Sequence, residues 1–363
     1  MECQFINSYE ELKEFSSAWD DLVRKSECTS FFSTAGFTRA WWRAYANSRD
    51  MHIAVVKDNN GSPRLIAPFQ SEKSNPLRWE SVGTNLINYN PFIVQRDDHE
   101  ALTYFCDWLK RRSDWKKLVL RTPGNATLPR FFKLPYRASL NAFQKLHCWL
   151  RLGTFFVELD VRRDHPYVNR QSLEQMTAIL QKKSYKWKIN VLSRQGVPAY
   201  QTTTDPAEIQ RHFDHFCELH ITEWLARSRK SQLVNPETRN FYRYVIEELA
   251  AYQILRLDMF NLNDKPIAYA LAAKWNNCLA SWIVCFDLEH ERSSPGKLLQ
   301  SNVIQSLINE DISEFDFGRG LQSHKLEYPC EVRDTVIISI HPSPIDAFVT
   351  KLKRHTIARR AAI

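Results

Sequence analysis

Glycine is scarce in this sequence, with nine residues among 363, or about 2.5% where roughly 7% is usual. The nine stand at positions 36, 61, 83, 124, 153, 196, 296, 318 and 320. No GxGxxG, GxxxxGKS/T or GxSxG pattern can be built from these positions. The sequence therefore excludes a dinucleotide-binding Rossmann turn, a Walker A loop and the nucleophile elbow of an α/β-hydrolase.

Paired cysteines and long apolar runs are also missing. The eight cysteines include no CxxC pair, so they predict reduced, mostly buried thiols rather than a disulfide framework or a zinc cluster. No apolar run approaches the roughly 20 residues that cross a bilayer. The first residues, MECQFINSYEEL, lack the apolar core of a signal peptide. We therefore expect a cytoplasmic protein without a metal, for which any membrane contact is peripheral.

Positive charge accumulates at the end of the chain. The sequence has 49 Lys and Arg residues and 41 Asp and Glu residues, so its formal net charge is +8. Five of the cations lie in the last segment, KLKRHTIARRAAI, which contains no acid. The rest of the chain therefore has a net charge of 8 − 5 = +3. Near these cations, Ile345, Phe348, Val349 and Leu352 share a helical face. Residues 343–363 thus predict a basic amphipathic tail, which either docks on an anionic membrane surface or packs on the body with a frayed end.

The length, with 44% hydrophobic and 25% charged residues, indicates a folded α/β protein of two domains or two halves. In the first half, helical patterns at 8–23, 37–46 and 98–112 surround a β-hairpin at 52–69 and a strand at 117–121. The second half repeats the order of helices and hairpin, with helices at 209–226 and 236–250, a hairpin at 254–275, a strand at 279–287, a helix at 296–308 and a strand at 314–318.

The connection between the halves is expected within or shortly after residues 121–165, which carry several prolines and read as less regular chain. We divide the chain into an N-terminal half at 1–150, a C-terminal domain at 151–342 and the tail at 343–363.

Residues 293–298, SSPGKL, have the pattern of a helix start that can bind an anion. Ser294 predicts the N-cap, and Pro295 suits the first helical position. A strand that leads into such a helix presents free N–H groups and the positive end of the helix dipole to a phosphate, and Lys297 adds a charge. An ordinary capped helix with a surface lysine is the alternative. The candidate cofactor-binding residues are Ser293, Ser294, Pro295, Gly296, Lys297 and Leu298.

The corresponding helix of the first half begins RDDHEAL. Asp97, Asp98 and Glu100 lie where an anion would bind, and their carboxylates would repel it. If one half alone binds an anionic cofactor, it is the second.

The strand EFDFG and the residues after it supply further candidates. Alternation places Phe315 and Phe317 on one face and Asp316 on the other. Asp316 could act as a general base or orient a substrate amine, and Arg319 and Lys325 could hold anionic groups. A surface ion pair between Asp316 and one of the two cations is the alternative.

His220 lies in the middle of an apolar helical face formed with Phe213, Phe216 and Trp224. It could assist proton transfer, or it could be a hydrogen-bonded core histidine. The spacing of His212, His215 and His220 does not match a zinc-binding helix.

Five segments in this order resemble the cellulose-biosynthesis-type (CelD/BcsL) acetyltransferases of the GNAT superfamily. They are LHITEW, FYRYVIEEL, LRLDMFNLNDKPIAYAL, FDLEHERSSPGKLLQSNVI and FDFGRGLQSHK, within residues 160–340, and FFSTAGFTRAWW is similar to the N-terminal half of that family. The resemblance implies a tandem GNAT-like fold of mixed sheets flanked by helices, akin to the Fem-type aminoacyltransferases. His324 departs from the tyrosine that the family usually has before Lys325.

The resemblance also implies that the second half binds acyl-CoA, with pantetheine between the strands at 279–287 and 314–318 and the pyrophosphate at SSPGK. We expect direct attack of an amine or hydroxyl on the thioester of an acyl-CoA, with acetyl-CoA as the donor that the resemblance implies, assisted by Asp316 or His220. The family-level acceptor is a sugar or envelope-polysaccharide precursor. Two alternatives stay open: a transferase that uses aminoacyl-tRNA, and a catalytically silent GNAT-like binding module.

Overall fold

The computed structural model describes residues 1–26, 30–84, 86–89, 92–123, 145–152, 155–175, 182–310 and 312–347. The chain forms two compact units. Unit 1 is built from residues 1–28, 32–163 and 334–363, and unit 2 from residues 29–31 and 164–333. Two strands, β8 (Phe155–Asn169) and β14 (Glu331–His341), contribute residues to both units. The boundaries expected from the sequence, at residues 150 and 342, stay a prediction.

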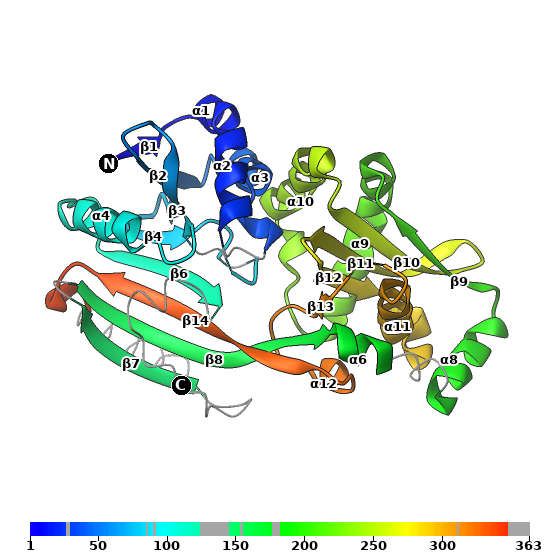
Figure 1. Cartoon of the computed structure of the whole chain (residues 1–363). Coiled ribbons are helices and arrows are strands. Elements are labelled where there is room, and N and C mark those ends of the chain that lie inside the picture. The colour runs from blue at the N-terminus through cyan, green and yellow to red at the C-terminus, as the bar shows by residue number, and fades with distance from the viewer. Residues whose placement is uncertain are drawn as a thin grey trace. The chain divides into compact units, whose positions relative to one another are not determined.

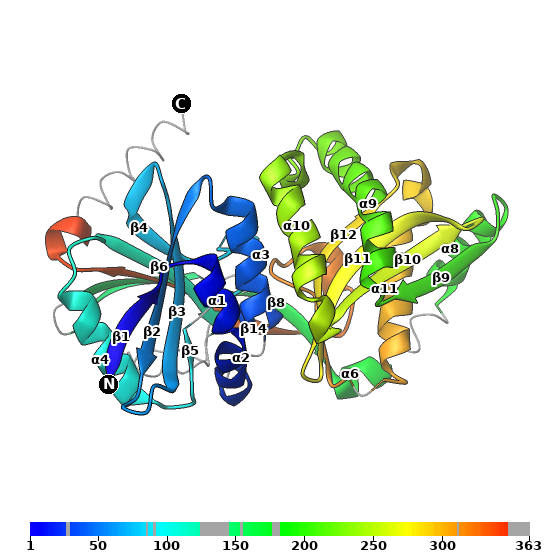
Figure 2. The same ribbon diagram turned by 90° about the horizontal axis from the view of Figure 1, so that it is seen from above.

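Unit 1 contains a mixed sheet in the order β1-β2-β3-β4-β6-β14-β8, with β5 beside β3 and β7 beside β8 (Figures 1 and 2). The pairing of β4 with β6 is parallel. Besides β8 and β14, its elements are β1 (Glu2–Ile6), α1 (Tyr9–Glu14), α2 (Ser16–Lys25), α3 (Ala35–Tyr45), β2 (Arg49–Lys57), β3 (Pro63–Glu72), β4 (Asn75–Ser81), β5 (Ile93–Val94), α4 (His99–Lys110), β6 (Lys117–Pro123) and β7 (Lys145–Leu152).

The first predicted helix is two helices. Ser8 is the N-cap as expected, and its hydroxyl accepts the Glu11 N–H at 3.1 Å. The helix then breaks at Phe15. The Ser16 hydroxyl donates to the Leu12 carbonyl oxygen at 2.9 Å, a local side-chain bond that competes with the helical ladder.

The expectation of irregular chain up to residue 165 is wrong for β7 and β8. Along β8, the apolar residues Phe155, Val157, Leu159 and Val161 occupy every second position and are all buried. This period of two is a strand pattern, and the prolines that suggested a loop at 123–135 come before it. Residues 124–144 lie outside the described residues.

Unit 2 contains a sheet in the order β8-β13-β12-β11-β10-β9. Helices α9 and α10 cover one face of β10–β12, and α11 packs on the other (Figures 1 and 2). Both helices, the hairpin and α11 were expected. The elements are α6 (Arg170–Gln175), α8 (Lys183–Ser193), β9 (Pro198–Thr203), α9 (Pro206–Ala226), η2 (Gln232–Val234), α10 (Pro236–Glu248), η3 (Ala250–Tyr252), β10 (Leu255–Leu262), β11 (Lys265–Trp275), β12 (Cys278–Phe286), η4 (Leu288–Ser293), α11 (Pro295–Leu307), β13 (Glu314–Asp316) and α12 (Ser323–Leu326).

One edge of β12 is only partly paired. Its first residues, Cys278–Ala280, pair in parallel with β13, and in the described part of the chain no strand pairs with Ser281–Phe286 on that side. The register with β11 shifts so that Trp282 is an extra residue, a β-bulge. The second half of β12 therefore leaves backbone groups open beside the start of α11.

The tail begins as a helix at residues 344–347. Residues 348–363, which include the five cations of the predicted amphipathic helix, lie outside the described residues. Within the described ranges, no helix is both long and apolar enough to cross a membrane.

Candidate functional site

The start of α11 follows the end of β12 through the short helix η4. Ser294 stands at the N-cap position and Pro295 at the first helical position, as expected. The expected side-chain cap is wrong: the Ser294 backbone is left-handed, with φ 51°, and its hydroxyl accepts none of the first-turn N–H groups. A capping residue normally has an extended backbone that places its side chain over the first turn. Here the Ser294 N–H closes η4 instead, by donating to the Glu291 carbonyl at 2.8 Å.

Because Pro295 has no N–H, Gly296 supplies the first donor of the helix, and its N–H has no acceptor within the helix. The Lys297 and Leu298 N–H groups donate to the Ser294 carbonyl at 3.0 and 3.2 Å. A Cβ on Gly296 would lie 3.3 Å from the Phe286 ring, so the first turn of α11 directly adjoins the last residue of β12. The Ser293 hydroxyl donates to the His290 carbonyl at 2.8 Å, and Leu298 is fully buried in the core.

Two lysines lie near this helix start. Lys297 donates to the Glu327 carboxylate at 2.6 Å, and both side chains are partly exposed. Burial lowers the pKa of Lys188 on α8, and the charge of Lys297 lowers it further. Exposed ion pairs contribute little to stability, so Glu327 holds the Lys297 ammonium only weakly. An anion bound here would also relieve the repulsion between the two ammonium groups.

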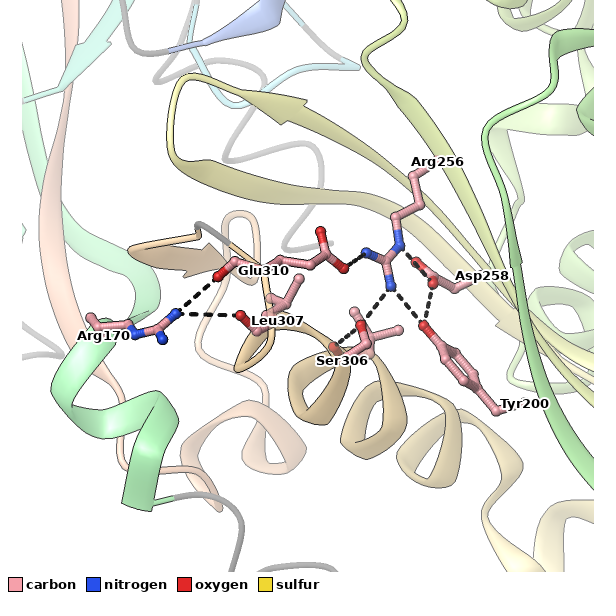
Figure 3. A network of polar contacts seen from close by, with 8 residues as sticks. Arg170, Tyr200, Arg256, Asp258, Ser306, Leu307 and Glu310 are labelled. Atoms are coloured by element: carbon pink, nitrogen blue, oxygen red, sulfur yellow. Dashed lines mark hydrogen bonds and ion pairs between the residues drawn. The ribbon is translucent and has the colours of Figure 1, made fainter.

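The helix that carries this site is fixed to the sheet by a buried arginine (Figure 3). Arg256 on β10 donates to Asp258 at 2.8 Å, and to the Tyr200 hydroxyl, Ser306 hydroxyl and Glu310 carboxylate at 2.7 Å each. The network joins β9 and β10 to the last turn of α11.

A second arginine, Arg170 on α6, closes the far end of the same helix (Figure 3). Its guanidinium donates to four backbone carbonyl oxygens at 3.0–3.4 Å, those of Leu307, Ile308, Glu310 and Ile312. A cation in this position satisfies carbonyls that lack helical partners and interacts favourably with the helix dipole.

In the first half, carboxylates stand at the equivalent helix start. Asp98 caps α4 by accepting the Ala101 N–H at 3.1 Å, and it accepts two hydrogen bonds from Arg64 at 2.7 Å. Glu100 also pairs with Arg64, at 3.2 Å. Carboxylates therefore occupy the first turn of α4, whereas the first turn of α11 has none.

Asp316 pairs with a histidine that the sequence did not single out. Its Oδ1 lies 2.6 Å from Nε2 of the fully buried His165 and accepts the Gly318 N–H at 2.7 Å. Burial by itself would raise the pKa of Asp316, but the charge and hydrogen bond of His165, the charge of Arg333 and the Gly318 N–H together lower it. No sequence pattern indicated His165, because β8 and β13 meet only through the folding of distant segments.

The alternative interpretation, a surface ion pair between Asp316 and a nearby cation, does not describe Lys325. Its ammonium donates to the Gly318 and Arg319 carbonyl oxygens at 3.1 Å each, and the side chain is buried. Burial lowers the pKa of Lys325 to about 8, against the opposing charges of Asp316 and Asp164. Burial also lowers the pKa of Arg319.

His220 is a buried, hydrogen-bonded histidine. Its Nδ1 lies 2.8 Å from the Ser231 hydroxyl, and its ring stacks with those of Phe216 and Trp224. Burial lowers the pKa of His220 to about 4, so the ring is neutral at neutral pH. These contacts agree with the core-histidine interpretation.

The histidines of α9 do not converge on one point. Nδ1 of His212 and of His215 each lie near the Tyr269 hydroxyl, at 3.2 and 3.0 Å, whereas His220 contacts Ser231. Elsewhere in the described ranges, ligand atoms of Asp287, Glu289 and His290 lie within 4.8 Å of one another. The Asp287 carboxylate already caps η4 by accepting the Glu289 N–H, so we assign no ion to that group.

Glu223 is a second residue that sequence reasoning missed. It is 9% exposed, and its Oε2 accepts the Phe286 N–H at 3.3 Å. Its Oε1 lies 3.4 Å from the Arg227 guanidinium. Burial raises the pKa of Glu223, although Arg227 and the Phe286 N–H oppose the rise. The signal was present in the segment LHITEW, where a carboxylate stands close to the buried His220.

Comparison with known proteins agrees with this geometry. Residues 181–326 match the family model of the acetyltransferase (GNAT) domain. A search of curated proteins gave no match.

Three solved structures share the fold. The crystal structure of FemX has a TM-score of 0.57 and 9% identity, covering 93% of this chain and 97% of that chain. The C-terminal domain of a putative lysylphosphatidylglycerol synthetase from Agrobacterium fabrum has a TM-score of 0.53 and 11% identity, covering 96% and 98%. L-PGS from Bacillus licheniformis has a TM-score of 0.52 and 10% identity, covering 92% and 91%. The chain thus has a GNAT fold with mixed sheets flanked by helices, which confirms the expected fold class, and its GNAT domain makes it an acyltransferase.

Proposed function

We propose that the protein transfers an acyl group, with acetyl-CoA as donor, directly to the amine or hydroxyl of a saccharide acceptor. The observation that carries the proposal is the open second half of β12 beside the uncapped first turn of α11. This pair of features offers backbone donors to a thioester and a positive helix end to a pyrophosphate.

The residues at the start of α11 fit the phosphates of such a donor. The Gly296 N–H has no helical acceptor, glycine leaves room for close approach, and no carboxylate stands in the first turn. Lys188 and Lys297 add positive charge. The candidate residues named from the sequence, Ser293 to Leu298, therefore remain our proposed cofactor-binding segment.

The open edge of β12 supplies donors for the acyl carbonyl. The Asp287 N–H donates to the carbonyl oxygen of Ile267 on β11 at 2.8 Å. Because successive amides of a strand alternate in direction, the Phe286 and Val284 N–H groups face away from β11, toward the open side. The Phe286 N–H meets Glu223, and we infer that the Val284 N–H polarises the acyl carbonyl.

The other predicted roles stay predictions. Asp316 and His220 were named as groups that assist deprotonation, and Arg319 and Lys325 as holders of anionic groups. A link to the cellulose-biosynthesis-type acetyltransferases, and with it a sugar or polysaccharide-precursor acceptor, is supported by the segments quoted above and by the GNAT domain at 181–326.

Substitution of Gly296 by Asp tests the proposed site. The new side chain would meet the Phe286 ring and place a negative charge in the first turn, so acetyl-CoA affinity should fall by at least 100-fold. Isothermal titration calorimetry measures the affinity, and circular dichroism shows that the variant is folded. Gln305→Asp, in the last turn of the same helix, is the matched control and should bind like wild type. A folded Gly296→Asp variant with wild-type affinity would show that the site is misplaced.

A further inference from the structure

A carboxylate of α9 bonds to the open edge of β12. Within the described part of unit 2, Glu223 is the acidic side chain that bonds to this edge, through Oε2 and the Phe286 N–H. Phe286 also contacts the position of a Cβ on Gly296. The Glu223 carboxylate therefore lies on the open edge two residues, or roughly 7 Å, from the Val284 N–H, to which the proposed function assigns the reacting acyl carbonyl.

We propose that Glu223 takes the proton from the acceptor as the acceptor attacks the acyl carbonyl. The proposal rests on the acyltransferase function proposed above and names its general base. The new bond forms between the acceptor nitrogen or oxygen and the acyl carbon, and the carbon–sulfur bond breaks. The acceptor proton passes to the Glu223 carboxylate and from there to the departing CoA sulfur, so that the carboxylate is regenerated.

The contacts of Glu223 allow this role. Its other oxygen, Oε1, lies 3.4 Å from Arg227, whose side chain is 45% exposed and also reaches Glu291 at 3.5 Å. One oxygen of the carboxylate thus faces the strand, and the other faces an arginine whose side chain reaches the surface. Arg227 and Glu291 are the charged groups that act on it, with opposite effects.

Asp316 is held in a different way. One of its oxygens accepts hydrogen bonds from both His165 and the Gly318 N–H. A carboxylate stabilised in its charged form is a weaker base. The arrangement suits Asp316 to positioning His165 and the chain at Gly318.

His220 is neutral but enclosed. Its side chain is 2% exposed and stacks on the rings of Phe216 and Trp224. Its Nδ1 is hydrogen-bonded to the Ser231 hydroxyl. An acceptor would have to displace these neighbours to reach the imidazole. Glu223 lies one helical turn along α9, at the strand edge itself.

The inference is tested with the full chain, acetyl-CoA and glucosamine as the acceptor probe, measured as release of the CoA thiol over pH 5–9. Hydrolysis of acetyl-CoA without glucosamine is followed in the same assay. Glu223→Gln keeps an oxygen that can accept the Phe286 N–H but removes the base. Glu218→Gln, an exposed position on the same helix, is the matched control.

We expect Glu223→Gln to lower turnover by roughly 10²–10⁴-fold, with acetyl-CoA affinity within about twofold of wild type. The acid limb of the wild-type pH profile should disappear in the same variant, a change that a structural role would not produce. Glu218→Gln should keep the wild-type rate and profile. Wild-type turnover and an unchanged profile in Glu223→Gln would overturn the assignment, whereas failure of wild type to bind acetyl-CoA would contradict the proposed function itself.

Discussion

At the residue scale, the site combines buried ionisable groups whose roles depend on which atoms face them. Asp316 and Glu223 are both buried carboxylates, yet the pKa of Asp316 is lowered while that of Glu223 is raised. The difference comes from His165 and the Gly318 N–H, which stabilise charge on Asp316, whereas Glu223 meets a partly exposed arginine and one backbone N–H. When the pKa values of two carboxyl groups shift in opposite directions, the group with the raised pKa is the better general base, and the group with the lowered pKa stays charged.

His220 gives a stability prediction with a definite sign. Its pKa falls from 6.5 to about 4 on folding, so between these pH values the unfolded chain binds more protons than the folded one. Stability should therefore decrease as pH falls from 6.5 toward 4, by about 3 kcal/mol from this residue. Urea unfolding of wild type and His220→Phe at pH 7, 5.5 and 4 measures it. A stability difference between the two proteins that stays constant over this range would contradict the assignment.

Sequence reasoning reached some of these residues and not others. Ser294, Pro295 and Gly296 could be identified because capping and proline preferences are local. The partners of Asp316 and Phe286 could not, because His165 lies 151 residues from Asp316 and Glu223 lies 63 residues from Phe286. Contacts of this separation follow from strand order and helix packing, which a local pattern does not contain.

At the element scale, α11 acts as a fixed support for the proposed phosphate site. Its first turn is free of carboxylates, and its last turn is held by Arg256 and Arg170 (Figure 3). The helix pattern at 296–308 predicted the element itself, but not the arginines that anchor it. They come from β10 and α6 and were not recognised as partners of this helix.

Removing Arg256 should weaken unit 2 strongly. Arg256→Met would leave Asp258, which is 0% exposed, without its cation. Breaking a buried pair from one side typically costs about 3–5 kcal/mol, whereas replacing both partners by apolar residues is much milder. Urea unfolding should show this loss for Arg256→Met and substantial recovery for Arg256→Met/Asp258→Leu. A loss below about 1 kcal/mol in the single variant would mean that the network does not anchor α11.

At the scale of the whole molecule, two compact units share a pattern of helices followed by a hairpin but differ at the helix that would hold a phosphate. The first turn of α4 contains Glu100 and is capped by Asp98, both paired with Arg64. The first turn of α11 contains no acid, and Lys297 lies in it. The sequence alone showed which of these two helix starts contains carboxylates. The structure adds that Arg64 pairs with both carboxylates at the start of α4.

The most direct test of the account is the stoichiometry of acetyl-CoA binding to the full chain, measured by isothermal titration calorimetry with wild type and Gly296→Asp. The account predicts one site per chain in wild type and none measurable in the variant, because carboxylates occupy the start of α4, the corresponding helix of unit 1, whereas the first turn of α11 has none. Two sites per chain, or one site that persists unchanged in a folded Gly296→Asp variant, would contradict it.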